Sequence, residues 1–283
     1  MSIVNELQRI QQAKTDLKTA IEAKGVTVAD TETIDVYAPK VDDVYNKGYE
    51  AGKADGGGGD SWYDTFWDAC QTATNAGGGT ILRTDYRYAF CYSGWTIDNF
   101  KPKYDIKPKM AEYMFYNPSI NGDLVQILEE QGVTLDFSEC TMFAWAFYSG
   151  KFSRIGVVDM RKVSSATNAN NVFRACPVTT IDKLIVSETY PIGTSSFIAC
   201  AKLENITIEG LITGNFTISS SPLTVESMKN IIAHLKDYAG TDKEFTYSVK
   251  FSSDCWEALD AEGNTAPNGG TWKEYVTSLG WTY

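Results

Sequence analysis

Histidine is almost absent from this sequence, since His234 is the only one among 283 residues. It falls off the apolar stripe of the helix expected around it, so we expect a solvated side chain rather than a general base. No Gly-x-Ser-x-Gly elbow is present to supply a nucleophile. No Cys-x-x-Cys pair or Asp-x-Asp-x-Asp-Gly loop is present to hold zinc or calcium. The sequence therefore predicts no cofactor, no metal site and no enzyme.

An excess of basic residues is also missing, because 25 Lys and Arg face 36 Asp and Glu, for a net charge of −11. Nucleic-acid phosphates require a basic face, so we expect no nucleic-acid partner. The longest apolar run, residues 142–148, is far shorter than the roughly 20 residues that span a bilayer, so no membrane insertion is expected. The N-terminus lacks the form of a signal peptide, which predicts synthesis and initial retention in the cytosol.

Disulfide spacing is not evident among the six cysteines. Cys176 and Cys200 each follow an aromatic residue by three positions, as small apolar fillers of a core. Without a secretory signal we interpret the cysteines as reduced, and three disulfides are the alternative.

One short pattern does return along the chain: an aromatic residue, a tight polar turn, and an apolar residue five or six positions on. The leading residues are 25, 32, 26, 24 and 21 positions apart, a period typical of solenoid proteins. The copies begin at Phe90, Phe115, Phe147, Phe173 and Phe197, with a weaker last copy at Ile218. We expect each leading aromatic in a shared core, and strands at 154–158, 181–186 and 205–208. Residues 124–130 predict an inserted helical turn or two.

At these residues the chain resembles the BspA-like leucine-rich repeat family. The resemblance is carried by Leu135-Asp136-Phe137-Ser138, by Val172-Phe173-Arg174-Ala175-Cys176, and by residues 197–203 and 113–117. It implies an α+β fold in which a short N-terminal helical or coiled-coil segment precedes a BspA-like leucine-rich repeat solenoid with helical caps. For function it implies only a binding surface.

The first helix carries a heptad seam of Ile3, Leu7, Ile10, Lys14, Leu17 and Ile21. A coiled coil on this seam would make a homo-oligomer, with a trimer favoured, and the alternative is an amphipathic helix that packs on its own neighbour. This opening is similar to the starts of tail-associated proteins of phages that infect Firmicutes. The matching segments are residues 13–21, Gly25-Val26-Thr27-Val28 and residues 37–41.

The expected organisation has five parts. Residues 1–46 form an oligomerisation or tail-attachment segment, 47–60 a glycine-rich linker, 61–80 an N-terminal cap helix, 81–223 the solenoid and 224–283 a C-terminal cap. Within the last part we expect a helix from Thr224, a strand over 245–251, and a capping box at residues 271–274 that opens a final helix.

Aromatic residues make up 13% of the chain and crowd the first three repeats. Exposed rings there suit stacking on sugars or docking of a protein, and additional core filling is the alternative. The candidate receptor-binding residues are Tyr86, Tyr88, Tyr92, Trp95, Tyr104, Tyr113, Tyr116, Trp145 and Tyr148. Asp105, Asp136 and Asp159 recur at comparable points of the repeats, which favours structural turns over a glycosidase pair.

These features together predict a non-enzymatic, phage tail-associated receptor-binding protein. Its partners would be a bacterial surface glycan or protein receptor and other phage tail proteins, and its location the virion. The second hypothesis is a bacterial cell-surface leucine-rich repeat adhesin. The third is a polysaccharide depolymerase.

Overall fold

A computed structural model describes residues 11–12, 14–15, 18–19, 22, 27–29, 66–67, 71–74, 80–91, 95–242, 246–261 and 263–283. The chain divides into two compact units, Met1–Phe66 and Trp67–Tyr283. In the first unit, the described residues between 11 and 22 are helical, and Lys18 and Glu22 form an ion pair of 3.7 Å one turn apart. Of the predicted seam only Lys14 is described. Ile3, Leu7, Ile10, Leu17 and Ile21 lie outside the described residues, as do linker residues 47–60.

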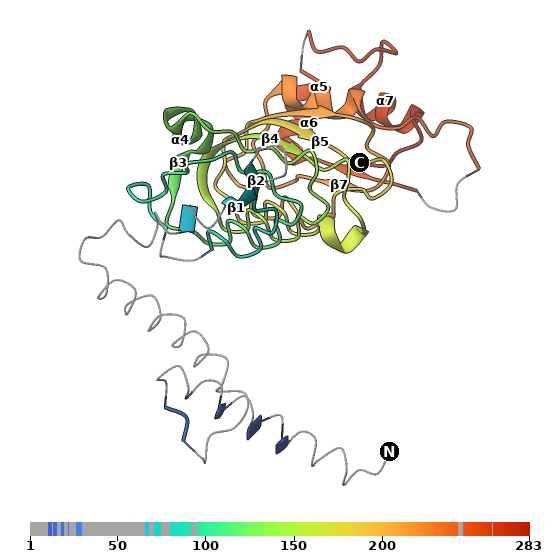
Figure 1. Ribbon diagram of the computed structural model, residues 1–283. Helices are drawn as coiled ribbons and strands as arrows, with labels where there is room; N and C mark the ends of the chain where they lie inside the picture. The colour runs from blue at the N-terminus through green and yellow to red at the C-terminus, as the bar shows by residue number, and fades with distance from the viewer. Residues whose placement is uncertain are drawn as a thin grey trace. The chain divides into compact units, whose positions relative to one another are not determined.

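The second unit is organised around a parallel sheet of four strands (Figure 1). The strands are β3 (Asn121–Asp123), β4 (Lys151–Asp159), β5 (Thr180–Ile185) and β6 (Asn205–Glu209), and they pair in chain order. Helix α4 (Leu124–Gln131) follows β3 directly and packs against β4. The Asp123 side chain caps its first turn, and Gly132 ends it at φ 67°.

The predicted α+β fold with a leucine-rich repeat solenoid and helical caps is therefore wrong. Neighbouring strands are parallel, and α4 lies in the crossover from β3 to β4, an arrangement of the α/β kind. Each strand signal lies within one repeat of the sequence, whereas inter-strand hydrogen bonds join all four strands into one sheet. Near the start of this unit, β1 (Gln71–Thr74) pairs with β2 (Thr80–Leu82) in antiparallel fashion, where the sequence predicted helix over 61–80.

A column of phenylalanine rings forms the centre of the core. The rings of Phe90, Phe115, Phe147, Phe173, Phe197 and Phe216 follow one another at centroid separations of 5.1, 5.5, 5.5, 5.4 and 5.5 Å. Each of these side chains is at most 2% exposed, so the leading aromatics are buried as predicted. The last ring belongs to Phe216, and Ile218, the weaker last copy, is also buried, with an exposure of 0%.

Helices cover the edge of the sheet that β6 forms (Figure 1). Helix α5 (Val225–Ala233) lies along β6, where Ser227 Oγ accepts a hydrogen bond from the Ile206 N–H at 3.0 Å and Asn230 Oδ1 accepts one from the Ile208 N–H at 2.6 Å. These two side chains take the place of a further strand and satisfy the edge of the sheet. Helices α6 (Ser253–Leu259) and α7 (Trp272–Ser278) follow, with the short pair β7 (Phe216–Thr217) and β8 (Val249–Lys250).

A 3₁₀ turn, η2, covers Ala166–Ala169, and Phe66 and Trp67 are also helical. Within the part of the chain that is described, no helix combines the length and the apolar character needed to cross a membrane.

Candidate functional site: an exposed aromatic face

The nine candidate aromatics divide between the core and the surface. Tyr86 and Trp95 are core residues, 1% and 2% exposed, and Trp95 Nε1 donates to the Ala89 carbonyl at 3.0 Å. For these two the core-filling alternative is the right one. Tyr104 is half-buried in the segment between two turns, and Tyr92 lies outside the described residues.

The other five rings gather into two adjoining columns, which we call the aromatic face. Tyr88 stacks on Tyr113 at 4.8 Å with an interplanar angle of 7°, and Tyr113 stacks on Trp145 at 5.9 Å and 5°. Tyr116 stacks on Tyr148 at 5.0 Å and 9°. The columns touch each other through Tyr113–Tyr116 and Trp145–Tyr148, at 5.4 and 4.9 Å.

Backbone hydrogen bonds between successive turns set the register of these rings. The Tyr88 N–H donates to the Glu112 carbonyl at 3.1 Å, and the Tyr113 N–H donates to the Ala144 carbonyl at 3.1 Å. In the second column the Asn117 N–H donates to the Tyr148 carbonyl at 2.9 Å. Each turn therefore places its aromatic side chain directly over that of the next turn.

Three of these residues hold a backbone conformation that bulky side chains avoid. Tyr88, Tyr113 and Trp145 have φ of 59°, 55° and 61°. The left-handed region costs an ordinary L-residue about 1–2 kcal/mol, and Gly or Asn occupies it most readily. At the corresponding place of the next turn the chain has Asn171, with φ 55°. The left-handed conformation also recurs at Ala175 and Ala199, with φ of 56° and 61°, so it belongs to the turns of the repeat. The first three turns place large rings in it, where Asn costs less, and residues in such conformations often gather at functional sites.

The rings offer mainly their edges, and Tyr113 alone is covered on both faces by column neighbours. Because neighbours in a column are nearly parallel, they cover one another's faces, and Tyr113, Tyr116, Trp145 and Tyr148 are only half-exposed. Tyr88, the first ring, is 53% exposed. Desolvation by burial raises the pKa of the Tyr88 and Tyr113 hydroxyls, so both remain neutral hydrogen-bond donors at physiological pH.

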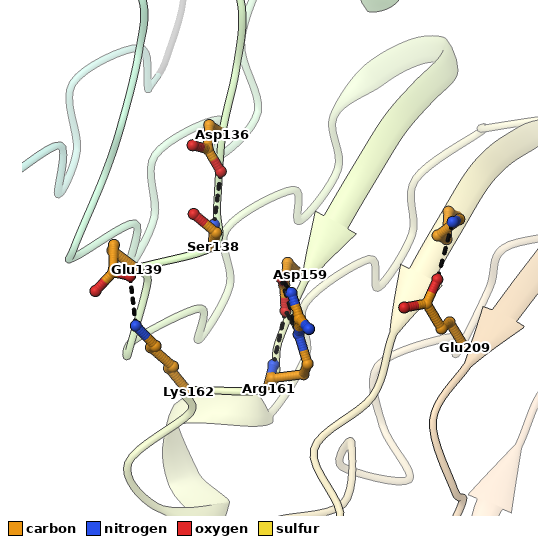
Figure 2. A network of polar contacts seen from close by, with 8 residues as sticks. Asp136, Ser138, Glu139, Asp159, Arg161, Lys162 and Glu209 are labelled. Carbon is orange, nitrogen blue, oxygen red and sulfur yellow. Dashed lines mark hydrogen bonds and ion pairs between the residues drawn. The ribbon is translucent and has the colours of Figure 1, made fainter.

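The recurrent aspartates have a structural role, as the sequence predicted. Asp136 accepts the Ser138 N–H at 2.9 Å, and Asp159 accepts the Arg161 N–H at 3.1 Å and pairs with the Arg161 guanidinium (Figure 2). Asp105 accepts the Thr134 N–H at 2.9 Å. These backbone hydrogen bonds are the main reason that the pKa of Asp105 and of Asp136 lies below the ordinary value.

The rest of the network in Figure 2 consists of surface ion pairs, Lys162 with Glu139 and Lys183 with Glu209, the latter at 2.9 Å. Exposed pairs of this kind contribute little to stability. Among the described residues no group of three or more His, Cys, Asp or Glu is placed to hold a metal ion.

His234 is half-buried rather than solvated as predicted. It ends helix α5, and its Nδ1 lies 2.8 Å from the Asn230 carbonyl oxygen. Five cysteines are free and buried in agreement with the reduced state that we predicted; they are Cys91, Cys140, Cys176, Cys200 and Cys255. Cys70 lies outside the described residues.

A cavity of about 240 Å³ lies between α4 and β4. Its lining is mainly apolar, with Leu124, Leu128 and Val157 among the contributors. Asp182, the acidic residue on the sheet side, already makes two hydrogen bonds to the Arg154 guanidinium, at 2.8 and 2.9 Å. The polar side chains of Glu129 and Thr134 complete a lining that is otherwise apolar, and we take the larger aromatic face as the candidate site.

No protein-family model, curated protein or solved structure matches this chain.

Proposed function

We propose that this protein is a non-enzymatic receptor-binding protein, and that the aromatic face is where it contacts a receptor on a bacterial surface. One observation carries the proposal: Tyr88, Tyr113 and Trp145 keep large, partly exposed rings at φ near +60°, where the chain uses Asn171 one turn later. Their side chains lie outside the phenylalanine column that forms the centre of the core. A binding role accounts for the cost.

The proposal extends to a phage virion because the N-terminal segment resembles tail-associated phage proteins. In that setting the N-terminal segment assembles copies, as a trimer or another homo-oligomer, or attaches the chain to other tail proteins. Several copies of one face on a virion would bind a cell surface with high avidity even if each contact is weak.

The hydrogen bonding of the recurrent aspartates favours binding without catalysis over depolymerase activity. Asp136 and Asp159 each accept a backbone hydrogen bond within a turn, and Asp105 accepts one from Thr134 in a later segment of the chain. These bonds lower the pKa of Asp105 and of Asp136, and the general acid of a glycosidase needs the opposite shift.

The test is saturable binding of the fluorescently labelled full chain to a panel of Firmicutes cells, measured by flow cytometry. The variant with Tyr113→Asn and Trp145→Asn removes two rings of the aromatic face. It introduces asparagine, which tolerates the left-handed backbone conformation at both positions. Tyr283→Asn is the matched control, since Tyr283 is an exposed tyrosine of a different surface.

We expect the wild type and the Tyr283 variant to bind alike. The double variant should lose at least about 30-fold in affinity, as for a pair of hot-spot residues. Equal binding by the double variant, or release of reducing sugars by the wild type, would contradict the proposal.

A further inference from the structure

The columns of the aromatic face continue beyond the last ring. The Ser149 N–H donates to the Arg174 carbonyl at 2.9 Å, as the Asn117 N–H does to the Tyr148 carbonyl. The backbone register therefore gives Arg174 the place after Tyr148, just as it gives Tyr148 the place after Tyr116. By the same rule Asn171 follows Trp145, whose N–H donates to the Asn170 carbonyl at 3.1 Å.

Arg174 differs in its partners from the arginines that form ion pairs in the structure. Arg87, Arg154 and Arg161 each pair with a carboxylate. In the described part of the chain no carboxylate lies within ion-pair distance of Arg174. Its Nη1 donates to Asn171 Oδ1 at 3.2 Å, which holds the half-buried guanidinium beside the end of the aromatic face. An arginine without an internal carboxylate partner is notable in a protein of net charge −11.

Two properties of this extended face indicate the chemistry of its partner. A guanidinium with unused donors is suited to bind a carboxylate in bidentate fashion. Stacking of a sugar ring requires an open aromatic face, and column neighbours cover both faces of Tyr113 and one face of each of the other four rings. Ring edges, neutral phenol hydroxyls and an arginine instead match the Tyr, Trp and Arg composition of protein–protein hot spots.

We infer that the receptor bound by this face is a protein, and that it presents a carboxylate to Arg174 next to apolar or aromatic groups that contact the ring edges. The inference depends on the proposed function, because it assigns the partner class of the same face. A glycan receptor is the competing result that the experiment must separate.

The experiment uses cell envelopes from a strain that binds the full chain. One portion is treated with proteinase K, which removes exposed protein, and another with mild periodate, which opens sugar rings. Binding is titrated for the wild type, Arg174→Gln and Arg174→Lys, with Lys202→Gln as a control for loss of one exposed positive charge. Each titration is repeated at low and high salt.

We expect protease to abolish binding and periodate to leave it unchanged. Arg174→Gln should weaken binding at least about tenfold and Arg174→Lys should restore little of it, because an ammonium cannot form the bidentate pair. Lys202→Gln should bind as the wild type does.

Binding that survives protease, is lost after periodate and still depends on Tyr113 and Trp145 would overturn the protein partner while leaving the proposed function intact. Wild-type affinity of Arg174→Gln would overturn the role of Arg174. Absence of binding to every envelope would overturn the proposed function together with the inference. Binding that no substitution of Tyr113, Trp145 or Arg174 weakens would do the same.

Discussion

Replacement of Tyr88 by asparagine should leave the stability of the protein nearly unchanged, although it removes a whole aromatic ring. The ring stacks on one neighbour, Tyr113, and is 53% exposed. Loss of one aromatic pair costs about 0.5–1.5 kcal/mol. Relief of the left-handed conformation at φ 59° returns about 1 kcal/mol, because Asn tolerates this region better than Tyr. We therefore expect a free energy of unfolding within about 1 kcal/mol of the wild type.

Two comparisons isolate the backbone contribution. Tyr88→Ala removes the same ring but introduces a residue that tolerates the left-handed region less well than Asn does. It should therefore be less stable than Tyr88→Asn. Tyr283→Asn starts from the same exposed fraction, 53%, and loses contacts with the Trp256 ring at 5.5 Å and the Lys273 ammonium at 5.3 Å without any backbone relief. It should be destabilised by about 1–2 kcal/mol.

The assay is equilibrium unfolding in urea, with equal m-values as the condition for comparison. If Tyr88→Asn is destabilised by more than about 2 kcal/mol, or is no more stable than Tyr88→Ala, the left-handed conformation is not costly for a tyrosine at this position. The conformation of Tyr88 would then give no support to a binding role for its ring.

Three further predictions concern the scaffold that holds the face. Phe147→Ala should cost about 3–5 kcal/mol in urea unfolding, because Phe147 is fully buried between Phe115 and Phe173. Asn230→Ala should cost about 1–3 kcal/mol by thermal denaturation, since the Ile208 N–H loses its acceptor, whereas exposed Glu226→Gln on the same helix should be neutral. Burial raises the pKa of the Cys140, Cys176 and Cys200 thiols from 9.0 to about 12, so stability should be full below pH 9 and fall as the pH rises toward 12. The slope should be about 1.4 kcal/mol per pH unit for each thiol, measured by urea titration, because the unfolded thiols ionise first.

Local features of the second unit were predictable because they depend on short-range patterns. The helix after Thr224 and the capping box at Thr271 and Glu274 were both expected and are present. The three β-branched runs are β4, β5 and β6. Within the described part of the predicted strand, residues 246–251, the structure has β8, and helix α6 was not expected.

The fold class was not predictable, because it depends on which strands pair and in which direction. Pairing is a long-range property, and the repeat period alone does not specify a parallel four-stranded sheet with α4 in one crossover.

The aromatic face was predicted as a group of residues but not as a geometry. Composition could not distinguish Tyr86 and Trp95, which are buried, from Tyr88 and Tyr113. The burial of each ring depends on whether its side chain points toward the core or toward the surface. Arg174 was missed entirely. The repeat spacing held the necessary signal, since the 26 positions between Phe147 and Phe173 also separate Tyr148 from Arg174.

The most direct test of the central claim is hydroxyl-radical footprinting of the full chain, free and bound to cell envelopes, with oxidation read residue by residue in a mass spectrometer. Tyr88 and Tyr283 are equally exposed in the free protein and serve as a matched pair. If the aromatic face contacts the receptor, envelopes will protect Tyr88 and leave Tyr283 unchanged. Oxidation of Tyr88 at the same rate in the bound and free protein, with protection elsewhere, would contradict the account.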